Sequence, residues 1–158
     1  MAAKLGKHPI HPMLVVFPIG IWALSLVGDL IFLYGNNTFW RELAFYSMVG
    51  GLVGALAAAI PGLIDYFDMS AAPPRVKTLA TRHMTINLIV VGLYGVNLWL
   101  RAAGMEIAGW PVSLSVLAML LLAVSGWLGG ELVYVHGMGV ELPKQSGPGA
   151  ERGKRRVA

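Results

Sequence analysis

The chain has 158 residues, of which 56% are apolar and only 13% are charged, with a formal net charge of +4. Its mean hydropathy of +0.67 lies far above that of soluble globular domains, in which about a quarter of the residues are charged. This composition excludes a soluble domain and intrinsic disorder. The lack of cysteine excludes disulfides, thiolate metal sites and thiol catalysis. We therefore expect a small integral membrane protein.

Four apolar segments are long enough to cross a bilayer, which takes about 20 residues of helix. They cover residues 13–33, 43–64, 84–100 and 111–136. The first contains one charged residue, Asp29, and the fourth contains one, Glu131. Because the segments show no alternation and lipid cannot satisfy an open sheet edge, they are predicted to be helices. The predicted fold class is all-α, an antiparallel up-down four-helix membrane bundle over residues 1–142.

Turn residues separate the four segments. Gly35 and the two asparagines after it follow the first segment, and such residues are typical of turns. The pair Pro73-Pro74 cannot lie in the interior of a helix, and residues 104–111 connect the last two segments. Residues 143–158 are rich in Lys, Gln, Ser, Gly, Pro, Glu and Arg, so we expect a disordered basic tail.

Basic residues gather on one side of this bundle. An even number of crossings places both termini on the same side, together with ten of the twelve lysines and arginines: Lys4, Lys7, Arg75, Lys77, Arg82, Lys144, Arg152, Lys154, Arg155 and Arg156. Only Arg41 and Arg101 lie on the other side. The positive-inside rule then predicts cytoplasmic termini, in a bacterial inner membrane. Since topology accounts for the net charge, we expect the lipid bilayer and no nucleic acid as a partner.

All four histidines are expected at the cytoplasmic end. His8 and His11 precede the first span, His83 opens the third and His136 closes the fourth, while Asp65 ends the second span at the same level. Both early histidines precede prolines, which disfavour helical geometry in the residue before them, so neither is expected to begin a regular helix turn. Ionisable groups that converge in a membrane protein indicate a functional site.

Two kinds of cofactor suit such a cluster. One is haem b, held by axial histidines from different helices of a bundle. The other is a bare transition metal with nitrogen and oxygen ligands. His83 and His136 are the leading ligand candidates, followed by His11 and His8, and in the bare-metal case Asp65 joins His83, His136 and His11.

Other polar residues are candidates to orient these ligands from outside the first coordination sphere. They are Asn87, one turn after His83, and Glu131 and Tyr134 near His136. No catalytic signature such as HExxH, GxGxxG, GxSxG or a Walker loop is present. The leading hypothesis is therefore an electron-transfer module with a redox protein partner, in preference to a stand-alone enzyme.

Two alternatives stay open. A transporter or proton-handling channel could use polar stripes that run from His11 to Asp29 and from His83 to Arg101. Four spans with no inverted repeat in the sequence would then require a homo-oligomer. The second alternative is a structural membrane subunit without a cofactor.

Several polar and small residues are expected to have structural roles. Asp29 is expected to pair with Arg101 or Asn97 near the outer face. The small residues Gly50, Gly54, Ala58 and Gly62 repeat every four positions, a spacing that lets helix backbones approach closely. Aromatic residues near the span ends are expected in the interfacial belt, and they are Tyr66, Tyr94, Trp40, Trp99 and Trp110.

A set of motifs together resembles a known family. They are His8-Pro9-x-His11-Pro12, Val16-Phe17-Pro18-Ile19-Gly20, Asp29, Gly62-x-x-Asp65-Tyr66, His83-x-x-x-Asn87, Asn97 with Arg101, and Gly129-Gly130-x-x-Val133-Tyr134-x-His136-Gly137. Over residues 7–140 the chain resembles the bacterial membrane proteins of domain-of-unknown-function family 2231. The resemblance implies a four-helix membrane domain. Fusion of some relatives to Rieske-type iron–sulfur domains implies electron transfer, although this chain has no cysteine for such a cluster.

The charge asymmetry gives a direct test of topology. A reporter enzyme that is active only in the periplasm should be inactive when fused after Ala158, because the positive-inside rule retains that end in the cytoplasm. The same reporter fused after Asn36 is the positive control. Activity of the Ala158 fusion would reverse the orientation and place the histidines outside the cell.

Overall fold

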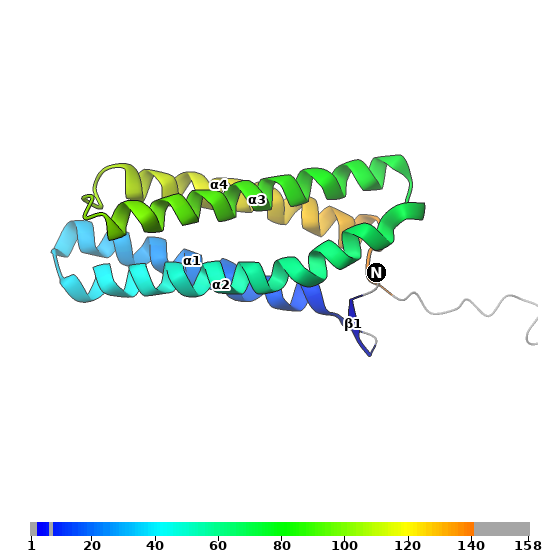
Figure 1. Cartoon of the computed structure of the whole chain (residues 1–158), viewed down its shortest axis with the longest axis horizontal. Coiled ribbons are helices and arrows are strands. Elements are labelled where there is room, and N and C mark those ends of the chain that lie inside the picture. Colours follow the sequence, from blue (N-terminus) through cyan, green and yellow to red (C-terminus); the bar gives the residue numbers. More distant parts are fainter. Residues whose placement is uncertain (1–2, 7, 141–158) are drawn as a thin grey trace, which may run out of the picture.

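The computed structural model describes residues 3–6 and 8–140, and within them the chain forms a bundle of four long antiparallel helices (Figure 1). The helices are α1 (Ile10–Gly35), α2 (Thr38–Asp68), α3 (Pro74–Ala102) and α4 (Trp110–Gly130). A short 3₁₀ turn, η1 (Met69–Ala71), follows α2, and a π-helical turn, η2 (Glu131–Val135), continues α4. The predicted all-α up-down bundle is confirmed. The expected tail at 143–158 lies outside the described residues.

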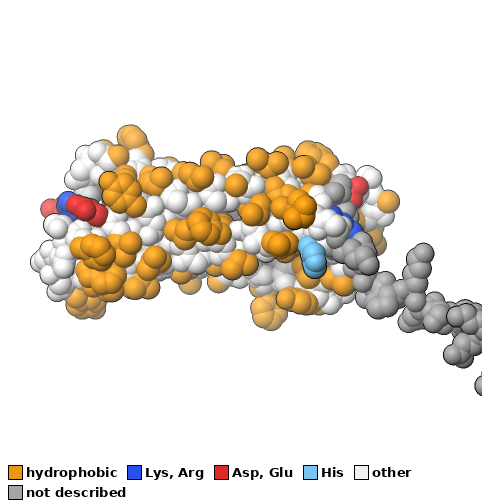
Figure 2. Space-filling view, turned by 90° about the horizontal axis from the view of Figure 1, so that it is seen from below, with side chains coloured by type: hydrophobic (Ala, Val, Ile, Leu, Met, Phe, Trp, Pro, Cys, Tyr) orange, Lys and Arg blue, Asp and Glu red, His pale blue; other side chains and the backbone are white. Residues whose placement is uncertain are grey.

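Each helix is long and apolar enough to cross a membrane. Helices α1, α2 and α3 extend beyond the predicted spans, because residues at the membrane surface continue a helix after the hydrocarbon ends. The fourth span was predicted to end at residue 136, whereas α4 ends at Gly130 and η2 at Val135. The extension is largest in α3, which begins at Pro74, nine residues before His83. Proline is tolerated there, since the first helical position needs no backbone N–H. Figure 2 shows one face, on which hydrophobic side chains run along the bundle and charged side chains gather at its ends.

A small hairpin precedes the first helix. Strands β1 (Lys4–Leu5) and β2 (His8–Pro9) pair antiparallel, with Leu5 opposite His8. The backbone N–H of Ala3 donates a hydrogen bond to Asp65 Oδ1 at 3.0 Å, which ties the hairpin to the end of α2. His8 is extended, as expected from the following proline.

The same expectation is wrong for His11. This residue lies in the first turn of α1, although Pro12 follows it. The physical reason is that a proline in the first turn of a helix loses no hydrogen bond, since those N–H groups have no intrahelical partner in any case. His11 is therefore fixed to the helix and its side chain faces the bundle.

Glycines allow α1 to pack closely against α2. A Cβ on Gly51 would overlap the indole of Trp22, and one on Gly54 would lie 2.9 Å from the Phe17 ring. A Cβ on Gly62 would lie 2.8 Å from the His11 ring. The packing role predicted for the small-residue stripe is confirmed at Gly54 and Gly62. The tightest approach is at Gly51, next to the predicted position.

The hairpins α1–α2 and α3–α4 repeat one pattern of contacts. The Ser25 hydroxyl donates to the backbone carbonyl of Ala44 at 2.8 Å, and the Asn97 amide donates to that of Pro111 at 2.7 Å. Asn97 follows Ser25 by 72 positions, and Pro111 follows Ala44 by 67. The second hairpin is thus a structural repeat of the first, related to it by an approximate twofold axis along the bundle.

Side chains from α1 and α3 meet at this axis. These helices are parallel and lie diagonally, since α1 packs mainly on α2 and α3 mainly on α4. The pairs that meet are again 72 positions apart, namely His11–His83, Trp22–Tyr94 and Asp29–Arg101. The ring of Trp22 stacks on that of Tyr94 at 4.1 Å and 12°. Tyr94 is fully buried, so its expected place in the interfacial belt is wrong.

The contacts at the glycines predict that two alanine substitutions will differ in their effect on stability. Gly51→Ala should destabilise the bundle by about 1–3 kcal/mol, since overpacking a filled interior costs that much. Gly92→Ala is the control, because no atom lies within 4 Å of a Cβ there, and it should be neutral or slightly stabilising. Thermal unfolding in detergent, followed by circular dichroism, measures both. Equal melting temperatures for the two variants would contradict the close approach at Trp22.

Candidate functional site

Buried polar side chains gather near both ends of the bundle. The basic end carries the hairpin and the α2–α3 junction, and the turn end carries the α1–α2 turn and the α3–α4 loop (Figure 1). His83 and Arg101 mark the two levels on α3. They are separated by about 27 Å at the helical rise of about 1.5 Å per residue, close to the thickness of the hydrocarbon core.

His11 and His83 meet at the basic end. Their ring centroids are 6.3 Å apart and the planes lie at 85°. The Nδ1 atom of His11 is 2.8 Å from the backbone carbonyl oxygen of Ala58, and that of His83 is 2.8 Å from the carbonyl oxygen of Ser125. The histidines are 72 positions apart and their carbonyl partners 67, so the two sites are equivalent in the repeat. We call His11 and His83 the histidine pair.

The carbonyl contacts fix the protonation of both rings. A carbonyl oxygen only accepts hydrogen bonds, so Nδ1 of each ring must carry the proton and donate it. In a neutral imidazole the lone pair is then on Nε2. Metal-binding histidines are commonly oriented by a backbone carbonyl in this manner.

Equivalent glycines make room for the two rings. Gly62 lies four residues after Ala58, and Gly129 lies four residues after Ser125. A Cβ on Gly129 would lie 3.0 Å from the His83 ring, as one on Gly62 would lie 2.8 Å from that of His11. Each imidazole edge is therefore held against the backbone of the neighbouring helix.

Asn87 contacts the free nitrogen of His83. Its Nδ2 amide donates to His83 Nε2 at 3.1 Å and to the His83 backbone carbonyl at 3.0 Å. The Ser125 hydroxyl lies 3.0 Å from His83 Nδ1. Among the described residues, His11 Nε2 has no such hydrogen-bond partner, so the pair is symmetric in its Nδ1 contacts and asymmetric at Nε2.

The other predicted site residues lie elsewhere. His8 is exposed in β2. The His136 Nε2 atom is 3.9 Å from Glu131 Oε1, and Tyr134 points outward with 89% of its surface exposed. Asp65 is buried; its Oδ1 accepts from Ala3, and its Oδ2 has no hydrogen-bond partner among the residues that the structure describes.

The expected pairing of His83 with His136 is not found. The residue that faces His83 on α4 is Ser125, and His136 follows it by eleven residues. Eleven residues of helix correspond to about 16 Å, so the two histidines lie at different depths. The early start of α3 causes this difference, because it places His83 inside the helix and not at its end.

The four-residue set predicted for a bare metal is also not brought together. Among the described residues, no group of three or more histidine, aspartate or glutamate side chains lies close enough to hold one ion. The structure assembles two histidines, with Asn87 and Ser125 against one of them. Ser125 was not among the site residues predicted from the sequence. The only sequence feature that could have indicated it is that it is a small polar residue within an apolar segment.

A second polar cluster occupies the turn end. Arg101 donates through Nη1 and Nη2 to the two carboxylate oxygens of Asp29, at 2.7 and 2.5 Å, and through Nε to Asn97 Oδ1 at 2.9 Å. The Asn97 amide also donates to the Ser115 hydroxyl at 2.9 Å. The side chains of Asp29 and Arg101 are 0% and 4% exposed. The predicted pairing of Asp29 with Arg101 is confirmed.

An apolar layer separates the two clusters. It consists of Trp22, Met48, Val90, Tyr94, Ala118 and Leu122. Asn87 and Tyr94 are seven residues apart on α3, or about 10 Å along the helix. The two polar clusters therefore do not touch through this part of the bundle.

Comparison with known proteins gives one match. The model of a family described as "Predicted membrane protein (DUF2231)" matches residues 7–142. No curated protein matches the chain, and no solved structure matches it.

The buried ion pair predicts strong coupling between its two residues. Asp29→Asn or Arg101→Gln alone should destabilise the bundle by about 3–5 kcal/mol, because each leaves a buried charge without its partner. The double variant should be more stable than either single one. Unfolding in detergent measures this, with Glu42→Gln, an exposed carboxylate at the same end, as a control within about 0.5 kcal/mol of wild type. Additive losses would contradict the pairing.

Proposed function

Because the chain belongs to the DUF2231 family of predicted membrane proteins, we propose its function from the site: His11 and His83 bind a transition-metal centre for membrane electron transfer. The observation that carries the proposal is the symmetric anchoring of the pair. Both Nδ1 atoms lie 2.8 Å from a backbone carbonyl oxygen at equivalent positions of the two hairpins. With Nδ1 protonated, each ring directs an Nε2 lone pair toward a ligand on the approximate twofold axis, although that of His83 now accepts a hydrogen bond from Asn87.

The spacing of the pair is compatible with a shared metal. Two metal–imidazole bonds of about 2.0 Å each, together with the two ring radii, approximate the 6.3 Å between the centroids. His11 and His83 would hold the metal, and Asn87 would have to rotate from the Nε2 atom that it now contacts at 3.1 Å. The bound metal would supply one-electron chemistry.

The number of ligands narrows the kind of metal centre. Structural zinc takes four protein ligands, whereas the described part of the chain assembles two histidines and no third acidic or histidine group. Haem b can be held by one or two histidines, since the porphyrin supplies four nitrogens itself, and His11 and His83 would hold it here. A bare ion would complete its coordination with water. The count therefore favours haem b over a structural zinc ion.

The depth of the pair supports electron exchange at the membrane surface. His83 lies about 27 Å from Arg101 along α3, which places it near one edge of the hydrocarbon. The basic end around it carries Lys4, Arg75, Lys77 and Arg82. By the positive-inside rule this end faces the cytoplasm of a bacterium. A redox protein partner on that side is part of the same proposal.

Transport through a single chain is less well supported. A proton path from the histidine pair to Asp29 would have to cross the apolar layer around Trp22 and Tyr94. Asp29 is also fully engaged by Arg101. These contacts favour a site at one end of the bundle over a path along it.

Cofactor loading of matched variants tests the proposal. The protein is purified in mild detergent from cells supplied with iron, copper and a haem precursor, and cofactor per protein is measured by absorption and metal analysis. His11→Ala or His83→Ala should each release most of the cofactor, and the double variant should lose little more, since two ligands of one centre act together. His8→Ala is the control and should load like wild type, because His8 is exposed.

Three outcomes would contradict the assignment. Full loading of both single variants would exclude the histidine pair as ligands. Loss in His136→Ala with full loading in His11→Ala would make His83 and His136 the pair. Wild-type protein without any cofactor would favour a cofactor-free structural subunit or an oligomeric transporter.

A further inference from the structure

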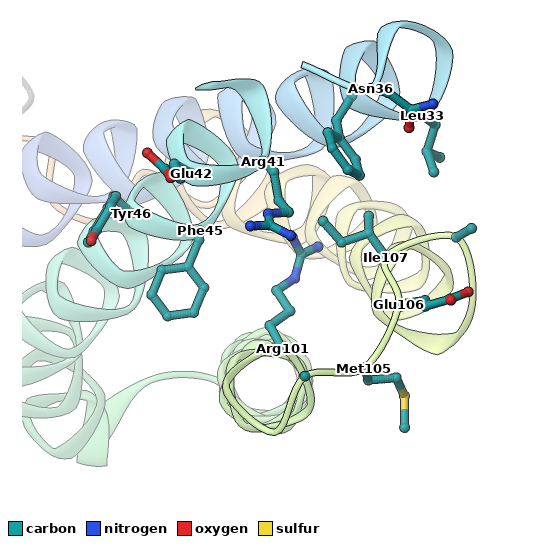
Figure 3. Close-up of a pocket in the computed structure, with 13 residues that line it drawn as sticks. Leu33, Asn36, Arg41, Glu42, Phe45, Tyr46, Arg101, Met105, Glu106 and Ile107 are labelled. Carbon is teal, nitrogen blue, oxygen red and sulfur yellow. The ribbon is translucent and has the colours of Figure 1, made fainter. Parts of the chain in front are cut away.

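A hollow of about 800 Å³ opens at the turn end, far from the histidine pair. Figure 3 shows that it lies between the α1–α2 turn, the start of α2 and the α3–α4 loop. Its walls include the apolar side chains Phe32, Leu33, Phe45, Met105 and Ile107. Both basic residues of this end, Arg41 and Arg101, line it, and their guanidinium groups point toward one another (Figure 3).

Arg101 brings donors to the hollow without bringing net charge. Its positive charge is balanced by Asp29, to which Nη1 and Nη2 each donate one hydrogen bond. A guanidinium has five N–H groups in all. With one bond from Nε to Asn97, two N–H groups of Arg101 remain for another acceptor.

Arg41 brings an unbalanced charge. It lies in the first turn of α2, with its guanidinium 6.0 Å from the centroid of the Phe32 ring. Within the described part of the chain, no carboxylate lies within 4 Å of it. Glu42 and Glu106 also line the hollow, but both are exposed and Figure 3 shows them turned away from the two guanidinium groups.

The side chains around the hollow are those typical of a membrane interface. Exposed aromatic side chains surround this end, as in the aromatic belts of membrane proteins: Tyr34, Tyr46, Trp99 and Trp110. Two guanidinium groups above apolar walls fit an acceptor with several oxygens, and arginine binds phosphate through paired N–H groups.

We propose that this hollow binds a phosphate group, held by a pair of N–H groups of Arg41 and by an N–H group of Arg101 that Asp29 and Asn97 leave spare. The acyl chains of a phospholipid would continue along the apolar walls around Phe45. A phospholipid headgroup and free phosphate share this chemistry, and the exposed aromatic side chains around the hollow make the lipid the expected source.

Lipid binding to delipidated protein tests the proposal. The protein in non-ionic detergent is titrated with phosphatidylglycerol, phosphatidylcholine or inorganic phosphate, and binding is followed by native mass spectrometry and by the melting temperature. Phosphatidylglycerol should bind and raise the melting temperature of wild type. Arg41→Gln should bind it about tenfold more weakly, since a charge-assisted pair contributes about one such factor. Arg75→Gln, which removes an exposed arginine at the basic end, should bind like wild type.

The three ligands and the two variants distinguish a lipid phosphate from free phosphate, and a specific site from a general effect of charge. Equal stabilisation by millimolar inorganic phosphate, lost in Arg41→Gln, would support the phosphate site with free phosphate as its ligand. Equal binding of phosphatidylcholine and phosphatidylglycerol in wild type and in Arg41→Gln would overturn the proposal, since Arg41 would then contribute nothing to lipid binding. An equal loss in Arg75→Gln would do the same, because net charge alone would explain it. Arg41 is exposed and outside the Asp29 contact, so its variant should fold.

Discussion

Hydrocarbon offers no hydrogen-bond partner, so the polar side chains inside this bundle depend on groups of the protein itself, and the key ones reach a neighbouring helix. The histidines are the clearest case. His11 of α1 reaches a carbonyl of α2, and His83 of α3 reaches a carbonyl of α4. A helix carbonyl can take such a second bond only where the side chain comes close, and Gly62 and Gly129 leave the space for it. The same two glycines therefore allow the helices to pack closely and fix the orientation of the imidazole rings.

The same constraint divides the bundle into two polar ends and an apolar centre. Stacking of Trp22 on Tyr94 fills the middle of the twofold axis with aromatic surface, while the histidines and the Asp29–Arg101 pair take the positions nearer the ends. A ligand at the histidine pair and a phosphate at the turn end would therefore act on different membrane surfaces. Among the described residues, the apolar layer lies between the histidine pair and the Asp29–Arg101 cluster, and no direct polar contact joins them.

Much of the fold could be predicted from the sequence because apolar length and proline or glycine breaks depend on few residues at a time. The pairing of Asp29 with Arg101 was also accessible, since two opposite charges at one depth of a membrane have few other partners. In contrast, the sequence did not allow us to predict that His11 faces His83. This arrangement depends on where α3 begins, and the polar residues from Pro74 to Arg82 gave no apolar signal that they continue the helix. The repeat was hidden because some equivalent positions share geometry but not residue type, as with Ser25 and Asn97, and the few that match, such as Gly62 and Gly129, are too sparse to reveal it.

The approximate twofold axis gives the Asp29–Arg101 pair a meaning beyond stability. Two hairpins of similar shape could in principle associate with copies of themselves, α1–α2 with α1–α2. Such an assembly would set Asp29 against a second Asp29, and the corresponding α3–α4 assembly would set arginine against arginine, both in hydrocarbon. Only the mixed combination brings opposite charges together at the axis. The pair would therefore favour association of the two different hairpins over self-pairing, in the way that repulsive contacts set partner choice in specific interfaces.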